Sequence, residues 1–169
     1  MSFASLESRF NALASRLQSP VLLLVRLGWG LQLVQTGWGK LTHLARTADY
    51  FASLNIPLPA VNAAAAGTCE FAGGLLLAVG LRARLAAVPI VATMAVALAT
   101  AERETVLKVF SEPTAVLEAT PFPFLLAALI VLVFGPGSIA LDTVVDRLKP
   151  AQPASTSRRE SAPRPAAGP

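Results

Sequence analysis

Residues 61–81 read VNAAAAGTCEFAGGLLLAVGL, a run of 21 residues that contains one carboxylate, Glu70, and no lysine or arginine. An α-helix needs about 20 consecutive apolar residues to cross the hydrocarbon core of a bilayer. Three further apolar stretches of similar length cover residues 21–39, 85–101 and 119–140. We therefore predict an all-α integral membrane protein, a bundle of four transmembrane helices.

The composition of the chain argues against a soluble protein and against a metalloprotein. Of its 169 residues, 54% are hydrophobic and only 14% are charged, compared with about 25% charged residues in an average soluble domain. The single cysteine, Cys69, cannot form an intrachain disulfide. The single histidine, His43, cannot ligate a haem from both sides or complete a multi-histidine zinc site. No haem or metal site is predicted.

The basic residues are unevenly divided between the two sides of the predicted membrane domain. An even number of spans places both termini on one side, which carries nine lysines and arginines against four on the other, with Arg26 inside the first span. The positive-inside rule therefore predicts that both termini are cytoplasmic. The same distribution accounts for the net charge of +4, so we expect contact with the lipid bilayer and not with nucleic acid.

The segments outside the spans divide the chain into three parts. Apolar side chains recur at helical spacing in residues 1–19, which predicts an amphipathic helix on the cytoplasmic membrane surface or, as the alternative, against a partner protein. Ser19 and Pro20 have the character of an N-cap and a first helical residue opening the first span. Residues 20–145 form the four-span domain, and residues 146–169, rich in proline, are predicted to be a disordered cytoplasmic tail. Short helices are expected in the outer loops, at residues 40–60 and 102–118.

Two charged residues lie inside the predicted spans, where an unpaired charge costs at least ~2.5 kcal/mol. Arg26 and Glu70 each share a helix face with glycines, which let helix backbones approach closely. These faces carry Gly30, Leu33, Gly37 and Lys40 on the first span and Ala63, Gly67, Gly74 and Leu77 on the second. A buried seam is predicted, in which Arg26 and Glu70 are paired directly or through Gln32. The alternative is that Arg26 extends to the headgroups and Glu70 is protonated. Cys69 points about 100° away from Glu70 and is predicted to be a packing residue.

A series of short motifs follows in a recognisable order over residues 20–145. They are RLG at 26–28, GWGKL at 37–41, EFAGGLLL at 70–77, GL at 80–81 with Arg82 and Arg84 after it, PFPF at 121–124 and FGPGS at 134–138. Together they resemble the DoxX family of small bacterial membrane proteins. The resemblance implies a four-helix protein of the bacterial inner membrane with a link to redox metabolism, since relatives include the membrane subunit of thiosulfate:quinone oxidoreductases.

The resemblance also indicates where a site would lie, because six residues match the family pattern. These are Arg26, Lys40, Glu70, Gly73, Gly74 and Arg82. We expect Glu70 and Arg26 to be catalytic. The residues expected to contact a cofactor are Gln32, Gly30, Gly37, Lys40, Gly73, Gly74 and Arg82. A quinone suits such a set because it needs a dry cleft, a polar contact for its head and a group that handles protons.

The sequence is compatible with three functions. The first is a membrane subunit of a redox system, with a quinone or small-ligand site between the first two spans and electrons supplied by a redox partner protein. The second is a non-catalytic anchor or assembly factor for such a partner. The third is a small proton-coupled transporter in which Glu70 carries the proton. Association with a partner protein and formation of a homo-oligomer are both left open.

Overall fold

The computed structural model describes residues 3–148, except for the side chains of residues 3–5, 146 and 147, and every regular element within this range is an α-helix. The helices are α1 (Phe3–Thr42), α2 (Leu44–Ser53), α3 (Pro59–Val79), α4 (Ala83–Thr100), α5 (Arg103–Leu107), α6 (Pro113–Glu118), α7 (Pro121–Phe134) and α8 (Leu141–Leu148). The all-α membrane fold predicted from the sequence is confirmed. Of the predicted tail, residues 146–148 belong to α8, and residues 149–169 lie outside the described residues.

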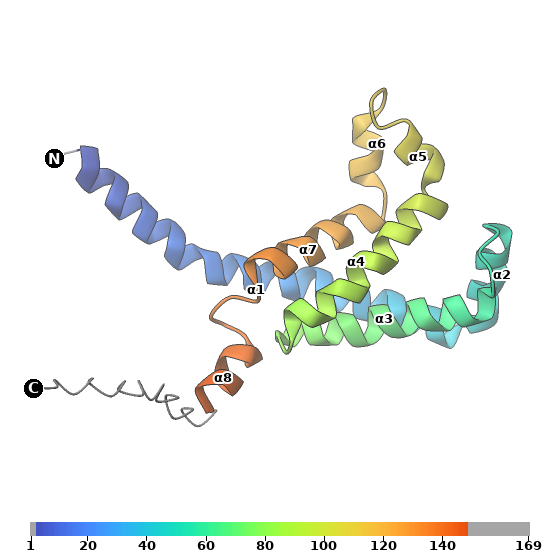
Figure 1. The fold of residues 1–169 in the computed structure, drawn as a ribbon, viewed down its shortest axis with the longest axis horizontal. Coiled ribbons are helices and arrows are strands. Elements are labelled where there is room, and N and C mark those ends of the chain that lie inside the picture. Colours follow the sequence, from blue (N-terminus) through green and yellow to red (C-terminus); the bar gives the residue numbers. More distant parts are fainter. Residues whose placement is uncertain (1–2, 149–169) are drawn as a thin grey trace, which may run out of the picture.

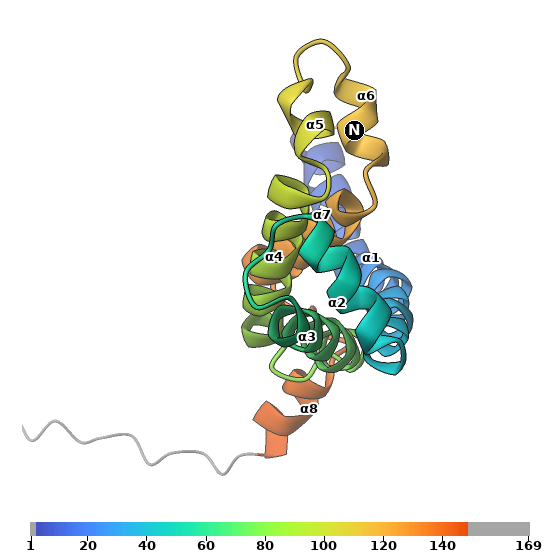
Figure 2. The same cartoon turned by 90° about the vertical axis from the view of Figure 1, so that its right-hand side faces the viewer.

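Four of the helices form two pairs. α1 lies beside α3, α4 lies beside α7, and the two pairs diverge toward one end of the molecule (Figure 1). That end carries α2, α5 and α6 and is called the loop end here; the opposite end, where α8 and the start of α1 lie, is called the terminal end. Figure 2 looks along the bundle from the loop end, with α2 in front of α1 and α3. The short helices predicted in both outer loops are therefore confirmed.

The predicted fourth span is shorter than expected. α1, α3 and α4 each contain a stretch long and apolar enough to cross a membrane, whereas α7 has only 14 residues, or about 21 Å of helix. It ends because Gly135 and Gly137 both have positive φ angles, of 81° and 80°, and Pro136 lies between them. Such backbone cannot continue an α-helix, so residues 135–140 are a connection and not the end of a span that reaches residue 140.

The first span has no separate start. α1 runs without interruption from Phe3 to Thr42, with Pro20 inside it, so the predicted N-cap at Ser19 is wrong. A proline removes one backbone donor, and membrane helices tolerate this when the freed groups are satisfied nearby. At about 1.5 Å per residue the 40 residues of α1 span about 60 Å. Its N-terminal half extends beyond the other helices (Figure 1), and the apolar side chains of Leu6, Phe10 and Leu13 are exposed there.

The core lies where the two helix pairs meet. Leu33 of α1, Leu77 of α3 and Ile90 of α4 are fully buried, and Phe124 of α7 packs against them. The Trp29 ring meets the ring of Phe124 edge to face, with centroids 5.5 Å apart, the geometry that aromatic pairs favour. These contacts join the two helix pairs near the middle of the bundle. Between this point and the loop end the two pairs are separated.

Candidate functional site

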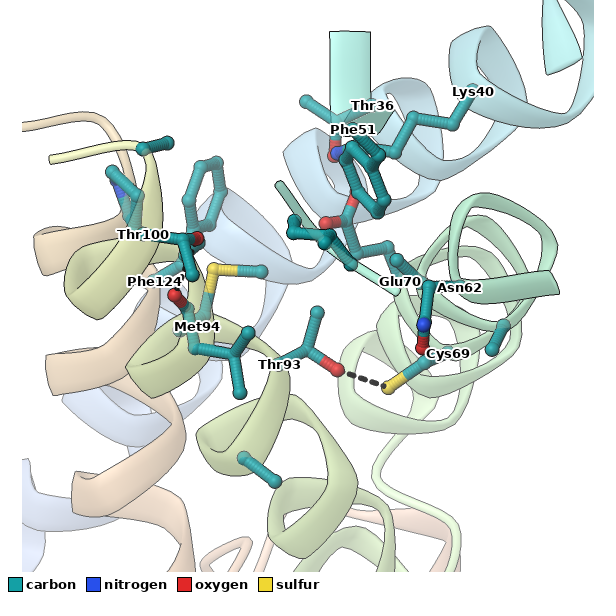
Figure 3. Close-up of a pocket in the computed structure, with 18 of the residues that line it drawn as sticks. Thr36, Lys40, Phe51, Asn62, Cys69, Glu70, Thr93, Met94, Thr100 and Phe124 are labelled. Atoms are coloured by element: carbon teal, nitrogen blue, oxygen red, sulfur yellow. Dashed lines mark hydrogen bonds and ion pairs between the residues drawn. The ribbon is translucent and has the colours of Figure 1, made fainter. Parts of the chain in front are cut away.

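A large cavity opens between the two helix pairs at the loop end. It has a volume of about 590 Å³ and is bounded by α1, α2, α3, α4 and the start of α7. Most of its wall is apolar, with Phe51, Ile56, Met94, Ala97 and Phe124 among the lining residues. Figure 3 shows side chains from these helices around the cavity. Ligand sites commonly combine an apolar wall with a few polar groups in this way.

The polar centre of the cavity wall is an ion pair between α1 and α3. Nζ of Lys40 donates to Oε2 of Glu70 over 2.5 Å. The Glu70 side chain is only 4% exposed, and that of Lys40 is 30% exposed. Lys40 stands in the last turn of α1 and Glu70 halfway along α3, so the long lysine side chain brings a charge from the helix end down to the carboxylate. Pairing a buried charge offsets the cost of removing it from water.

Several hydroxyl, thiol and amide groups complete the polar part of the wall. The hydroxyl oxygen of Thr93 lies 2.9 Å from the carbonyl oxygen of Pro89 and 3.3 Å from Sγ of Cys69, so its single O–H is within reach of both acceptors; the contact with Cys69 is drawn in Figure 3. Thr36 and Asn62 line the same cavity. Cys69, predicted to be a packing residue, packs against the hydrophobic core and also lines the cavity that contains Glu70. The side chains of Cys69 and Glu70 point in directions about 100° apart on α3, and the cavity is wide enough to be lined by both.

Three of the four glycines predicted to contact a cofactor, Gly30, Gly37 and Gly74, lie instead in direct contact between α1 and α3. A Cβ built on Gly74 would lie 2.7 Å from the carbonyl oxygen of Gly30, and one built on Gly37 would lie 2.7 Å from that of Gly67. Both distances are too short for real Cβ contacts. The seam between the first two spans is therefore filled by backbone, and the space for a ligand lies beside it, between the helix pairs.

Arg26 does not reach Glu70, so the predicted pair between them is wrong. Gly37 packs against the backbone of Glu70, and Arg26 lies 11 residues earlier on the same helix, or about 16 Å along its axis. Its side chain is completely buried, and Nη2 donates to the carbonyl of Ile139, in the connection after α7. Nε and Nη1 have no partner within the described residues. Arg26 thus ties α1 to the C-terminal connection at the terminal end.

The remaining predicted residues also lie away from the cavity. Gln32 is exposed on α1 and does not bridge Arg26 and Glu70. Gly73 faces the side chain of Ile90 and allows α3 and α4 to approach. Arg82 is exposed at the N-terminus of α4, at the terminal end. Of the predicted site residues, the cavity brings together Lys40 and Glu70.

The arrangement limits the class of ligand that the cavity can take. No group of three or more histidine, cysteine, aspartate or glutamate side chains suited to a metal occurs in the described part of the chain. The cavity instead offers a lysine ammonium, which donates up to three hydrogen bonds, beside a carboxylate, which only accepts when ionised. Such a wall suits an amphipathic organic molecule with one polar, oxygen-bearing head.

Residues 21–103 match the family model described as DoxX. This range contains α3 and α4, the membrane part of α1 and both members of the Lys40–Glu70 pair. No curated protein and no solved structure matches the chain significantly.

Proposed function

Because this is a membrane protein with a DoxX domain, we propose that it serves a redox system of the bacterial inner membrane and binds a quinone in the cavity at its loop end. The observation that carries this proposal is the Lys40–Glu70 pair, held at the wall of a mostly apolar cavity of about 590 Å³. The apolar wall suits the ring and the first part of an isoprenoid tail, and the pair suits the oxygens of the head. The proposed site lies between the two helix pairs, beside the α1–α3 seam in which the sequence predicted it.

The two charged residues have different roles in this proposal. Lys40 would donate a hydrogen bond to a carbonyl oxygen of a bound quinone, and Glu70 would orient the lysine and accept or release a proton next to that oxygen. A bound quinone supplies two-electron, two-proton chemistry, and the electrons come from a partner protein. The apolar side chains around the pair, such as Phe124 and Met94, exclude water from the ring.

The first prediction tests binding with the purified full-length protein in neutral detergent. Glu70→Gln and Lys40→Met should each weaken binding of a short-tail quinone at least tenfold, because a hydrogen bond to a charged group contributes about 1.5–3 kcal/mol. Quenching of tryptophan fluorescence measures binding, since Trp29 contacts Phe124 at the cavity wall. Glu118→Gln is the matched control, because Glu118 is exposed and does not line the cavity.

Two results would count against the proposal. If the unmodified protein does not bind the quinone, the cavity has another ligand. If Glu70→Gln binds it as tightly as Glu118→Gln does, the ion pair is not part of the site. Melting temperatures of all variants, measured without quinone, separate loss of binding from loss of fold.

A second prediction concerns orientation, which we propose places both termini in the cytoplasm. A fluorescent reporter that folds only in the cytoplasm should be active when fused after Leu148, and a phosphatase that is active only in the periplasm should be active when inserted between α5 and α6. The physical reason is the nine-to-four division of lysines and arginines between the two sides. The opposite pattern of activity would reverse the orientation.

A further inference from the structure

A second cavity lies at the terminal end, on the opposite side of the protein from the proposed quinone site. Its volume is about 350 Å³, and it lies between the start of α4 and the connection from α7 to α8. The residues that line it are Arg82, Arg84, Leu85, Phe134, Gly135, Pro136, Gly137, Asp142 and Thr143. The proposed function makes no use of this cavity.

The negative charge in this cavity is already engaged by the backbone. Oδ1 of Asp142 accepts from the backbone N–H of Arg82 over 2.6 Å, and Oδ2 accepts from that of Ala83 over 3.2 Å. The carboxylate therefore caps the N-terminus of α4, where a negative charge is favourable. Within the described residues, Asp142 forms no ion pair with Arg82 or Arg84, so it leaves the two arginine side chains available.

The two arginines keep most of their donors available. Arg84 is held in place by one bond, from Nη2 to the carbonyl of Val133 over 3.2 Å, and its guanidinium lies against Gly135. The Arg82 side chain makes no hydrogen bond or ion pair within the described residues, and both arginines are exposed to the cavity. A guanidinium carries five N–H donors, in a geometry that matches phosphate oxygens. The cavity thus presents two positive charges and several free donors.

Apolar side chains border the cavity on the side of the bilayer. Leu85 is 65% exposed and Phe134 is 62% exposed, and both belong to the cavity wall. They begin the apolar part of α4 and end that of α7, so the arginines lie where the hydrocarbon gives way to headgroups. A small water-soluble anion would make no use of these two side chains, whereas the acyl chains of a lipid would cover them.

From these observations we propose that this cavity binds the phosphate of an anionic phospholipid. Arg82 and Arg84 bind the phosphate oxygens, and the acyl chains lie along Leu85 and Phe134. The lipid would join the start of α4 to the end of α7. This site is independent of the proposed quinone site, because the two cavities share no lining residue and Lys40 and Glu70 line only the cavity at the loop end.

The test uses the purified full-length protein in neutral detergent, with phosphatidylglycerol as the probe and bound lipids counted by native mass spectrometry. Arg82→Gln should weaken binding of the first lipid about fivefold, since one basic residue near a membrane surface contributes about 1 kcal/mol. Arg82 is chosen because its side chain makes no bond that the fold requires. Arg16→Gln is the matched control: it removes the same charge from the exposed part of α1, outside the cavity, and should leave binding unchanged.

Three outcomes would overturn the proposal. Equal weakening in Arg82→Gln and Arg16→Gln would show that lipid is attracted by diffuse surface charge alone. Equal binding of phosphatidylglycerol and phosphatidylcholine would show that the arginines do not select an anion. If inorganic phosphate raised the melting temperature as much as phosphatidylglycerol, and Arg82→Gln removed that effect, the ligand would be a free phosphate and not a lipid.

Discussion

Gly37→Ala is expected to lower the free energy of unfolding by about 2–3 kcal/mol, because it forces a methyl group into a closed helix contact. A Cβ at this position would lie 2.7 Å from the carbonyl oxygen of Gly67 and 2.9 Å from the carbonyl carbon of Glu70, and it would meet the backbone nitrogen of Phe71 even more closely. All three atoms are backbone, so no side chain can rotate away. α1 and α3 must separate, and the Lys40–Glu70 pair that bridges them is disturbed as well.

A matched control for this substitution exists on the same helix. Gly28 has no atom within 4 Å of the position where a Cβ would stand, so Gly28→Ala should be neutral or stabilise α1 by up to about 1 kcal/mol through helix propensity. Unfolding in mixed detergent, followed by circular dichroism, measures both variants. Equal stability of the two would show that the seam is not packed as described.

Lys40→Met is expected to destabilise the protein by about 3 kcal/mol, because it leaves the buried Glu70 without a partner. Removing one member of a buried pair costs about 3–5 kcal/mol, and the partial exposure of Lys40 favours the lower end of that range. Replacing both residues by apolar ones removes the unpaired charge, so Lys40→Met combined with Glu70→Met should recover most of the loss.

The double variant makes the prediction about the Lys40–Glu70 pair falsifiable. Unfolding free energies of the four proteins, namely the parent, the two single variants and the double variant, form a double-mutant cycle. A strongly favourable coupling confirms the pair. If the two single effects simply add, Lys40 and Glu70 do not interact in the folded protein. The double variant should still fail to bind the quinone, which separates the stability of the pair from its proposed role in binding.

Properties of single helices were predictable from the sequence of this chain. The apolar runs at residues 61–81 and 85–101 correspond to α3 and α4, because the length and composition of a span are local properties. The end of α7 was misjudged for a local reason too, since the apolar run was extended through Gly135, Pro136 and Gly137. These residues carry little polarity but break the helix.

Relations between helices were less predictable. The sequence placed Arg26 and Lys40 on one face of α1, but which of them meets Glu70 depends on how far α1 is shifted along α3. Gly37 settles this register by packing against the backbone of Glu70. The glycines were also ambiguous, because a missing side chain allows close approach of either a ligand or another helix. The cavity itself arises because the two helix pairs diverge, and the sequence pattern of a single helix does not predict the angle between helices.

The bond from Arg26 to the carbonyl of Ile139 joins residues 113 positions apart, and this separation constrains how the protein is made. A ribosome completes α1 long before residue 139 is synthesised. During that interval the guanidinium lacks this partner, and an arginine held below the headgroups without partners is unfavourable. We therefore expect the nascent helix to favour a position shifted along its axis, with Arg26 at the headgroups, until the C-terminal connection is synthesised. The span that is synthesised first would then be the last to reach its final depth.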